Sequence, residues 1–142
     1  MNNVLSLYND LNALGVKFYC WDLDGERAAT LEMNGQYGVF MDFSNIRTLA
    51  EELVVVAHEG GHICTGATHK VSSPYDLIAK HEYKANKWAV EKCISEEDIK
   101  NAIAKGHTEI WDLAEYFGVT EDFMKMAVCW YKNGNLAVDM YF

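Results

Sequence analysis

The sequence predicts an α+β fold in which one helix and a three-stranded sheet are followed by helices only. The first third of the chain holds runs of β-branched and aromatic residues separated by turn pairs, a pattern typical of strands. Beyond this region, capping residues and apolar spacing become helical. At 142 residues, half of them hydrophobic, the chain is long enough to form one domain with a substantial core.

The first third of the chain is expected to form one helix and three strands. Asn3 can cap the helix through its side chain, and Gly15 favours its termination. The pair Asn34-Gly35 suits a hairpin turn, because both residues tolerate the positive φ angles that tight turns need. The expected elements are a helix over 3–14 and strands over 16–23, 28–33 and 36–42.

Five helices are expected after the sheet. Thr48 and Glu51 form a capping box, and Ser73 precedes a proline at the first helical position of the next segment. Serine or threonine also begins each later helix, and a glycine follows its end. The expected helices cover 48–65, 73–93, 95–105, 108–117 and 120–133.

Composition and charge argue against several classes of function. The formal net charge is −9 and the sequence pI is about 4.9, and lysine and arginine form no cluster. Nucleic-acid binders normally present a basic face, so direct nucleic-acid binding is not expected. No apolar stretch approaches the length of a membrane span, and the start of the chain lacks the basic and apolar regions of a signal peptide.

The four cysteines are scattered along the chain and form no C-x-x-C pair. We therefore interpret the chain as a reduced, cytoplasmic protein in which most cysteines pack in the core. Cys64, which follows the histidine motif described next, is included in that expectation.

The segment from His58 to His62 reads His-Glu-Gly-Gly-His. Histidines four residues apart lie on one face of a helix, where both imidazoles can bind one metal ion, and zinc is the default metal for such ligands. Glu59 follows the first histidine and can act as general base toward water at the metal, then return the proton to a leaving amine. The alternative is a chance match, in which two helix histidines have ordinary surface roles.

A catalytic zinc usually has three protein ligands and one open position. Glu82 lies on a helix face with Ala85 and Ala89, and small residues let two helices approach closely. We therefore predict Glu82 as the third ligand, with Asn86 one turn later as an orienting partner. A solvated surface charge is the alternative for Glu82, and His81, which points about 100° away, is the rival ligand.

These two segments resemble the signatures of the ImmA/IrrE metallopeptidases, a family common in phages and bacterial mobile elements. The resemblance rests on His-Glu-x-Gly-His at 58–62 and on Glu-x-x-Ala-Asn-x-Trp-Ala at 82–89. It implies that His58, His62 and Glu82 are metal ligands, that Glu59 is the catalytic base, and that the chain is a zinc-dependent endopeptidase.

The resemblance also implies a fold and a substrate. A minimal zincin-like core over 1–94 would carry a helical extension over 95–142, packed on it as a single structural domain. The substrate would be a helix-turn-helix repressor of a phage or mobile element. The alternative is a metal-binding regulator that binds a repressor or another partner without cutting it. The family often has leucine at Gly60, and because glycine costs about 1 kcal/mol in a helix interior, two adjacent glycines should loosen the helix unless packing compensates.

Several other features favour plain structural roles. Residues 110–120 resemble the first helix and turn of a helix-turn-helix, but the next helix lacks the basic residues that phosphate contacts need, so packing is the favoured interpretation. His69 is expected to be an ordinary loop histidine. The sequence leaves three tyrosines unranked as stabilisers of an oxyanion: Tyr75, Tyr83 and Tyr116.

Overall fold

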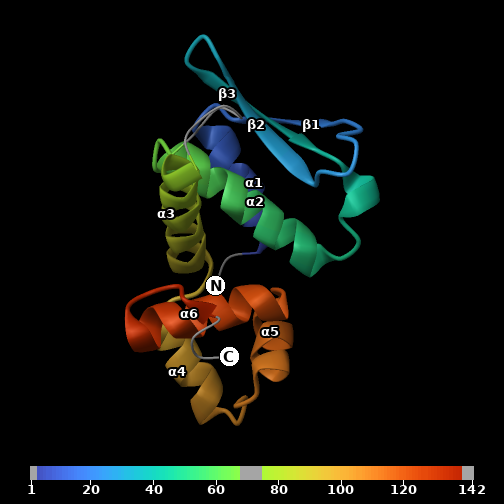
Figure 1. The fold of residues 1–142 in the computed structure, drawn as a ribbon. Helices are drawn as coiled ribbons and strands as arrows, with labels where there is room; N and C mark the ends of the chain where they lie inside the picture. The colour runs from blue at the N-terminus through green and yellow to red at the C-terminus, as the bar shows by residue number, and fades with distance from the viewer. Residues whose placement is uncertain (1–2, 68–74, 139–142) are drawn as a thin grey trace.

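A computed structural model describes residues 3–67 and 75–138 of the chain. Its described part has the expected α+β class, with a three-stranded sheet and six α-helices (Figure 1). The elements are α1 (Val4–Ala13), β1 (Lys17–Cys20), β2 (Ala28–Met33), β3 (Gln36–Met41), the short 3-10 helix η1 (Phe43–Asn45), α2 (Leu49–Cys64), α3 (Tyr75–Cys93), α4 (Glu96–Ala104), α5 (Ile110–Phe117) and α6 (Glu121–Asn133).

The sheet is mixed, with strand order β1-β3-β2. The central strand β3 runs parallel to β1 and antiparallel to β2. Asn34 and Gly35 have φ angles of 54° and 79°, which confirms the expected hairpin turn between β2 and β3. β1 ends at Cys20, three residues before its predicted end, because its partner β3 ends at Met41.

The helices α1 and α2 lie on one side of the sheet (Figure 1). α2 starts at the predicted capping box, in which the Thr48 hydroxyl accepts from the Glu51 amide at 3.1 Å and the Glu51 carboxylate accepts from the Thr48 amide at 3.0 Å. The helix continues unbroken through Gly60 and Gly61, and both glycines are buried. Packing therefore compensates for the helix propensity that the two glycines lack.

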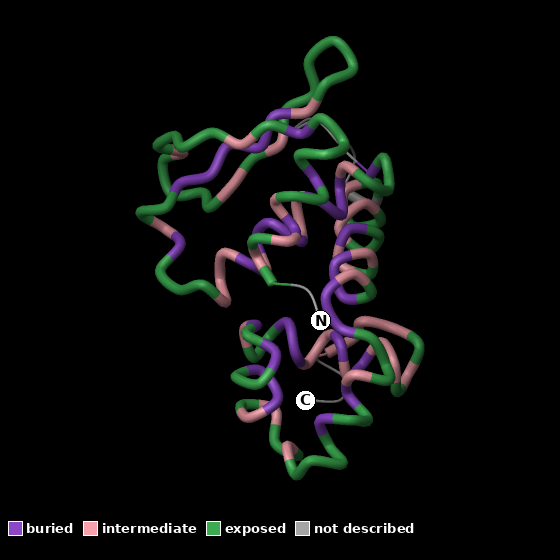
Figure 2. The backbone as a smooth tube through the Cα atoms, turned by 180° about the vertical axis from the view of Figure 1, so that it is seen from behind, coloured by how far each residue is buried: buried purple, intermediate pink, exposed green. Residues whose placement is uncertain are grey.

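The last three helices form a cluster beneath α3 (Figure 1). α5 begins at Ile110, and its N-cap is Glu109 instead of the predicted Thr108. The Glu109 side chain makes no capping hydrogen bond. Apolar residues of α5 and α6 belong to the same core cluster as residues of α1 and α2. Figure 2 shows buried segments, in purple, in both the upper and the lower part of the molecule. The buried inward faces agree with a packing role for 110–120.

The environments of the cysteines only partly match the expectation. All four are free thiols, and Cys93 and Cys129 are buried. Cys20 and Cys64 are exposed, so the core interpretation of Cys64 is wrong. Cys64 is the last residue of α2, where the helix has passed beyond the core that covers its middle.

Candidate metal centre

His58 and His62 occupy successive turns of α2, as their spacing predicts. Their ring centroids are 4.7 Å apart and their Nε2 atoms are 3.1 Å apart. The His62 side chain is buried, whereas the His58 side chain is about a quarter exposed, at 27%. The pair therefore presents two imidazole nitrogens to one point at the edge of the core.

Glu82 reaches that point from α3. Its Oε2 atom lies 3.0 Å from His58 Nε2, and its Oε1 atom lies 2.9 Å from His62 Nε2. One nitrogen from each histidine and one carboxylate oxygen lie within 4.8 Å of one another, which is compatible with a shared metal ion. Among the described residues, this cluster contains the three predicted ligands, and His81 is not part of it.

The two helices approach closely because Gly61 and Ala85 leave room at their crossing. Ala85 is fully buried, and its backbone carbonyl occupies the space where a side chain at position 61 would stand. A Cβ atom on Gly61 would lie 2.3 Å from the Ala85 oxygen. The approach brings the first turns of α3, including Glu82, to the histidines of α2.

The outer nitrogens of both histidines are already hydrogen-bonded. His58 Nδ1 donates to Asn86 Oδ1 at 2.8 Å, and His62 Nδ1 donates to the Ala67 backbone oxygen at 2.7 Å. A backbone carbonyl can only accept, so His62 Nδ1 carries a proton, and in the neutral imidazole Nε2 is therefore the ligand atom. Asn86 has the predicted orienting role, whereas Ala67 was not foreseen.

The pKa values of the cluster reflect its close contacts. Burial lowers the pKa of His58, but hydrogen bonding and attraction to Glu82 outweigh it and leave this pKa raised. Burial also opposes protonation of His62, and Glu82 together with the Ala67 carbonyl again raises its pKa. Hydrogen bonds from His58 and His62 lower the pKa of Glu82. Two histidines and a carboxylate held in this way form a preorganised set of donors for a cation.

Glu59 lies beside the cluster and has a partner that sequence reasoning missed. Its Oε2 atom accepts a hydrogen bond from Thr30 Oγ1 at 2.5 Å. Thr30 is in β2, the edge strand that lies against α2. Strand alternation could have placed Thr30 on the face toward the helices, but the sequence carries no signal for which helix residue it meets.

The cluster opens into a cleft of about 900 Å³ between β2 and α2. Neither Tyr83 nor Tyr116 lines it, and the Tyr116 ring instead contacts His107 in a tilted arrangement with centroids 4.5 Å apart. His69 and the side chain of Tyr75 lie outside the described residues. The lining residues are Gly25, Glu26, Arg27, Ala28, Ala29, Thr30, Val54, Val55, His58, Glu59, His62 and Glu82.

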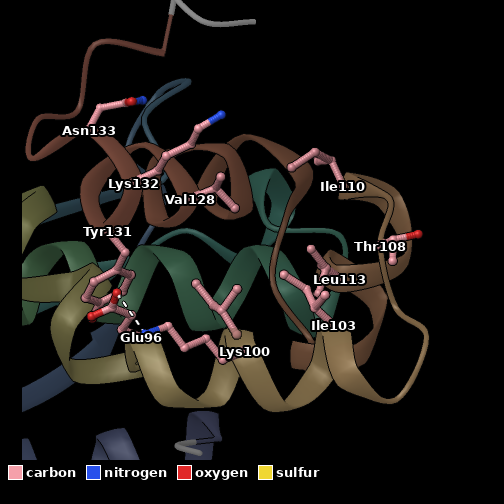
Figure 3. Close-up of a pocket in the computed structure, with 11 residues that line it drawn as sticks. Glu96, Lys100, Ile103, Thr108, Ile110, Leu113, Val128, Tyr131, Lys132 and Asn133 are labelled. Atoms are coloured by element: carbon pink, nitrogen blue, oxygen red, sulfur yellow. Dashed lines mark ion pairs between the residues drawn. The ribbon is translucent and has the colours of Figure 1, made fainter.

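A second cavity of about 460 Å³ lies among α4, α5 and α6, away from the metal cluster (Figure 3). Figure 3 shows Ile103, Leu113 and Val128 directed into the space between the helices. Lys100 at its edge pairs with Glu96 at 3.5 Å. The cavity holds no residue of the His58 cluster, and no histidine is among the residues that line it.

A family model described as IrrE N-terminal-like domain, Peptidase_M78, matches residues 44–128. The match covers more than half of the chain and includes both helices of the metal cluster. No curated protein and no solved structure matches the chain. Within the described ranges, no helix has the length and apolar character needed to cross a membrane.

Proposed function

Because the chain belongs to the IrrE N-terminal-like family of metallopeptidases, we propose that it is a zinc-dependent endopeptidase. The observation that carries this proposal is the convergence of His58, His62 and Glu82 beside Glu59. Three side chains from two helices meet at the wall of an open cleft, an arrangement typical of catalytic metal sites with one position left for substrate.

The donor set fits zinc. Two neutral imidazole nitrogens and one carboxylate oxygen are ligands that zinc prefers, and His58, His62 and Glu82 would hold it. A bound zinc ion would polarise a peptide carbonyl and lower the pKa of water at the centre. Asn86 and the Ala67 carbonyl hold the two imidazoles in orientation, and partners of this kind strengthen metal binding.

Glu59 is the proposed general base and general acid. The Thr30 hydroxyl holds one of its carboxylate oxygens, which leaves the other available for proton transfer. Glu59 would accept a proton from the attacking water and deliver it to the leaving amine. The wall of β2 would orient the carboxylate and limit access of bulk water.

The proposed substrate is a helix-turn-helix repressor of a phage or mobile element, cleaved in the cytoplasm. Resemblance to the ImmA/IrrE proteins supports this choice. The net charge of −9 also suits a basic DNA-binding protein as substrate and disfavours direct contact of the chain with DNA.

The test is incubation of the zinc-loaded chain with a purified helix-turn-helix repressor from the element that encodes it. Mass spectrometry should find one new N-terminus, and both Glu59→Gln and a chelator should abolish it. Glu59→Gln must retain zinc, because Glu59 is not a proposed ligand. The repressor could instead stay intact while the wild type and Glu59→Gln inhibit its DNA binding equally. That result would contradict the peptidase proposal and favour a non-catalytic metal-binding regulator.

A further inference from the structure

The face of the sheet opposite α1 and α2 carries an aromatic cluster around Phe40, which is itself buried. Tyr19 stacks on Phe40 with ring centroids 5.0 Å apart, and Trp21 meets Phe40 edge-on at 4.7 Å. Trp21 is 60% exposed and Leu31 is 51% exposed. We call Tyr19, Trp21, Phe40 and Leu31 the aromatic platform.

Strand alternation explains why these side chains share one face. Tyr19 pairs with Phe40 across β1 and β3, and Leu31 pairs with Gly38 across β2 and β3. Gly38 has no side chain, so the Tyr19 ring lies over it, 3.3 Å from the site of an added Cβ atom. Among the alternate residues, Val39 and Met41 belong to the core cluster and Phe18 packs against it, and Val39 is fully buried.

Acidic residues follow the platform residue Trp21 in the chain. Asp22, Asp24 and Glu26 are exposed in the loop that follows Trp21. An exposed indole beside carboxylates suits a lysine or arginine side chain, because the ring face and the negative charges both attract the cation. Large exposed apolar patches with a polar rim are typical of protein interaction sites.

The platform is continuous with the cleft. The acidic loop runs into β2, and Gly25 through Thr30 line the cleft wall. In β2, Ala29 lies on the same face as the platform, whereas Thr30 contacts Glu59. A polypeptide that enters the cleft can therefore reach the platform across a single strand.

We propose that the aromatic platform is a docking site for the protein substrate, and that it binds an apolar segment carrying lysine or arginine. This inference rests on the proposed function and deepens it, because it assigns substrate selection to a surface outside the metal centre. The basic side chain lies over Trp21 on the side of the acidic loop, and the apolar side chains cover Tyr19 and Leu31.

The test measures binding without cleavage, in the zinc-loaded Glu59→Gln protein. The probes are two fluorescent amphipathic peptides of identical leucine pattern, one with lysine and one with glutamate at the polar positions. The lysine peptide should bind, and Trp21→Ser should weaken it about tenfold. Trp111→Ser is the matched control, because Trp111 is 59% exposed on α5, and it should leave affinity unchanged.

A charge variant tests the site without disturbing the aromatic packing. In Asp22→Asn/Asp24→Asn, asparagine keeps the oxygen that Asp22 offers to the Asp24 amide and tolerates the positive φ of Asp24. Affinity for the lysine peptide should fall, and its dependence on salt should become weaker.

Three results would overturn the docking proposal. In the first, Trp21→Ser and the Trp111→Ser control bind the lysine peptide equally well. In the second, the parent protein binds the glutamate peptide as tightly as the lysine peptide. In the third, the parent protein is a dimer that does not bind the peptide and that Trp21→Ser dissociates. If the zinc-loaded wild type does not cleave the repressor but the lysine peptide still binds in a Trp21-dependent way, the proposed function is refuted and the docking site is retained.

Discussion

Gly61 of α2 lies against the backbone of Ala85 in α3, with no space for a side chain between them. A Cβ atom at position 61 would be 2.3 Å from the Ala85 oxygen and 2.9 Å from its Cα atom. Backbone atoms cannot rotate out of the way as side chains do, so any larger residue must separate the helices. Since α3 carries Glu82, this contact links helix packing to the geometry of the metal site.

Gly61→Ala is therefore expected to destabilise the protein and weaken metal binding. Overpacking in a well-packed core typically costs about 1–3 kcal/mol, more than the roughly 1 kcal/mol that alanine gains in helix propensity. Urea unfolding of the metal-free protein measures the stability, and competition with a chromophoric chelator measures the zinc affinity.

Gly60→Ala is the matched control. A Cβ atom there would lie 3.1 Å from a Leu11 methyl and 3.2 Å from the Trp88 ring, which are side-chain atoms that can shift. The gain in helix propensity should offset this crowding, so stability should change by less than about 1 kcal/mol. If both variants lose stability and zinc equally, the contact between Gly61 and Ala85 does not govern the site.

Zinc content should separate the ligands from the general base. The wild type and Glu59→Gln should each retain about one zinc per chain after dialysis, since catalytic sites of this type hold a single ion. His58→Ala and Glu82→Ala should lose it, because each removes one of three donors. Atomic absorption spectroscopy provides the measurement. If Glu82→Ala retains zinc, the third metal ligand is a residue other than Glu82, and His81 is the first candidate to test.

Removal of the Thr30 hydroxyl should slow catalysis without removing the metal. Thr30→Val keeps the shape of the side chain but frees the Glu59 carboxylate, and kcat should fall about tenfold as the base loses its orientation. KM and zinc content should stay near the wild-type values. Thr30→Ser restores the hydroxyl and should restore most of kcat. Equal kcat in the valine and serine variants would show that the bond has no positioning role.

Metal uptake should depend on pH with a defined sign. Glu82 raises the pKa values of His58 and His62 despite their burial, and both histidines must be neutral at Nε2 to bind zinc. Protons therefore compete with the metal, and affinity should fall as pH drops through these raised values.

Calorimetry in buffers of different ionisation enthalpy counts the protons that zinc displaces. About one to two protons should be released at a pH below the raised histidine pKa values, and fewer at a pH well above them, where both histidines are neutral. The same proton release at both pH values would contradict histidine ligation.

Local signals in the sequence predicted much of the fold. The Asn34-Gly35 turn and the Thr48 capping box are formed by residues close together in the chain, so their structures follow from local chemistry. The end of β1 was predicted less accurately, because it depends on where its partner strand β3 stops. The predicted start of α5 was also wrong.

The placement of His58 and His62 on one helix face follows from their spacing in the sequence, and the resemblance that pointed to Glu82 rests on sequence motifs alone. The packing of α3 against α2 brings Glu82 to both histidines, and it depends on the absence of a side chain at Gly61. Tertiary packing also brings Thr30 to Glu59 and leaves Tyr19 and Trp21 exposed around Phe40. These contacts join residues far apart in the chain, and their partners depend on how strands and helices pack, which short-range periodicity does not encode.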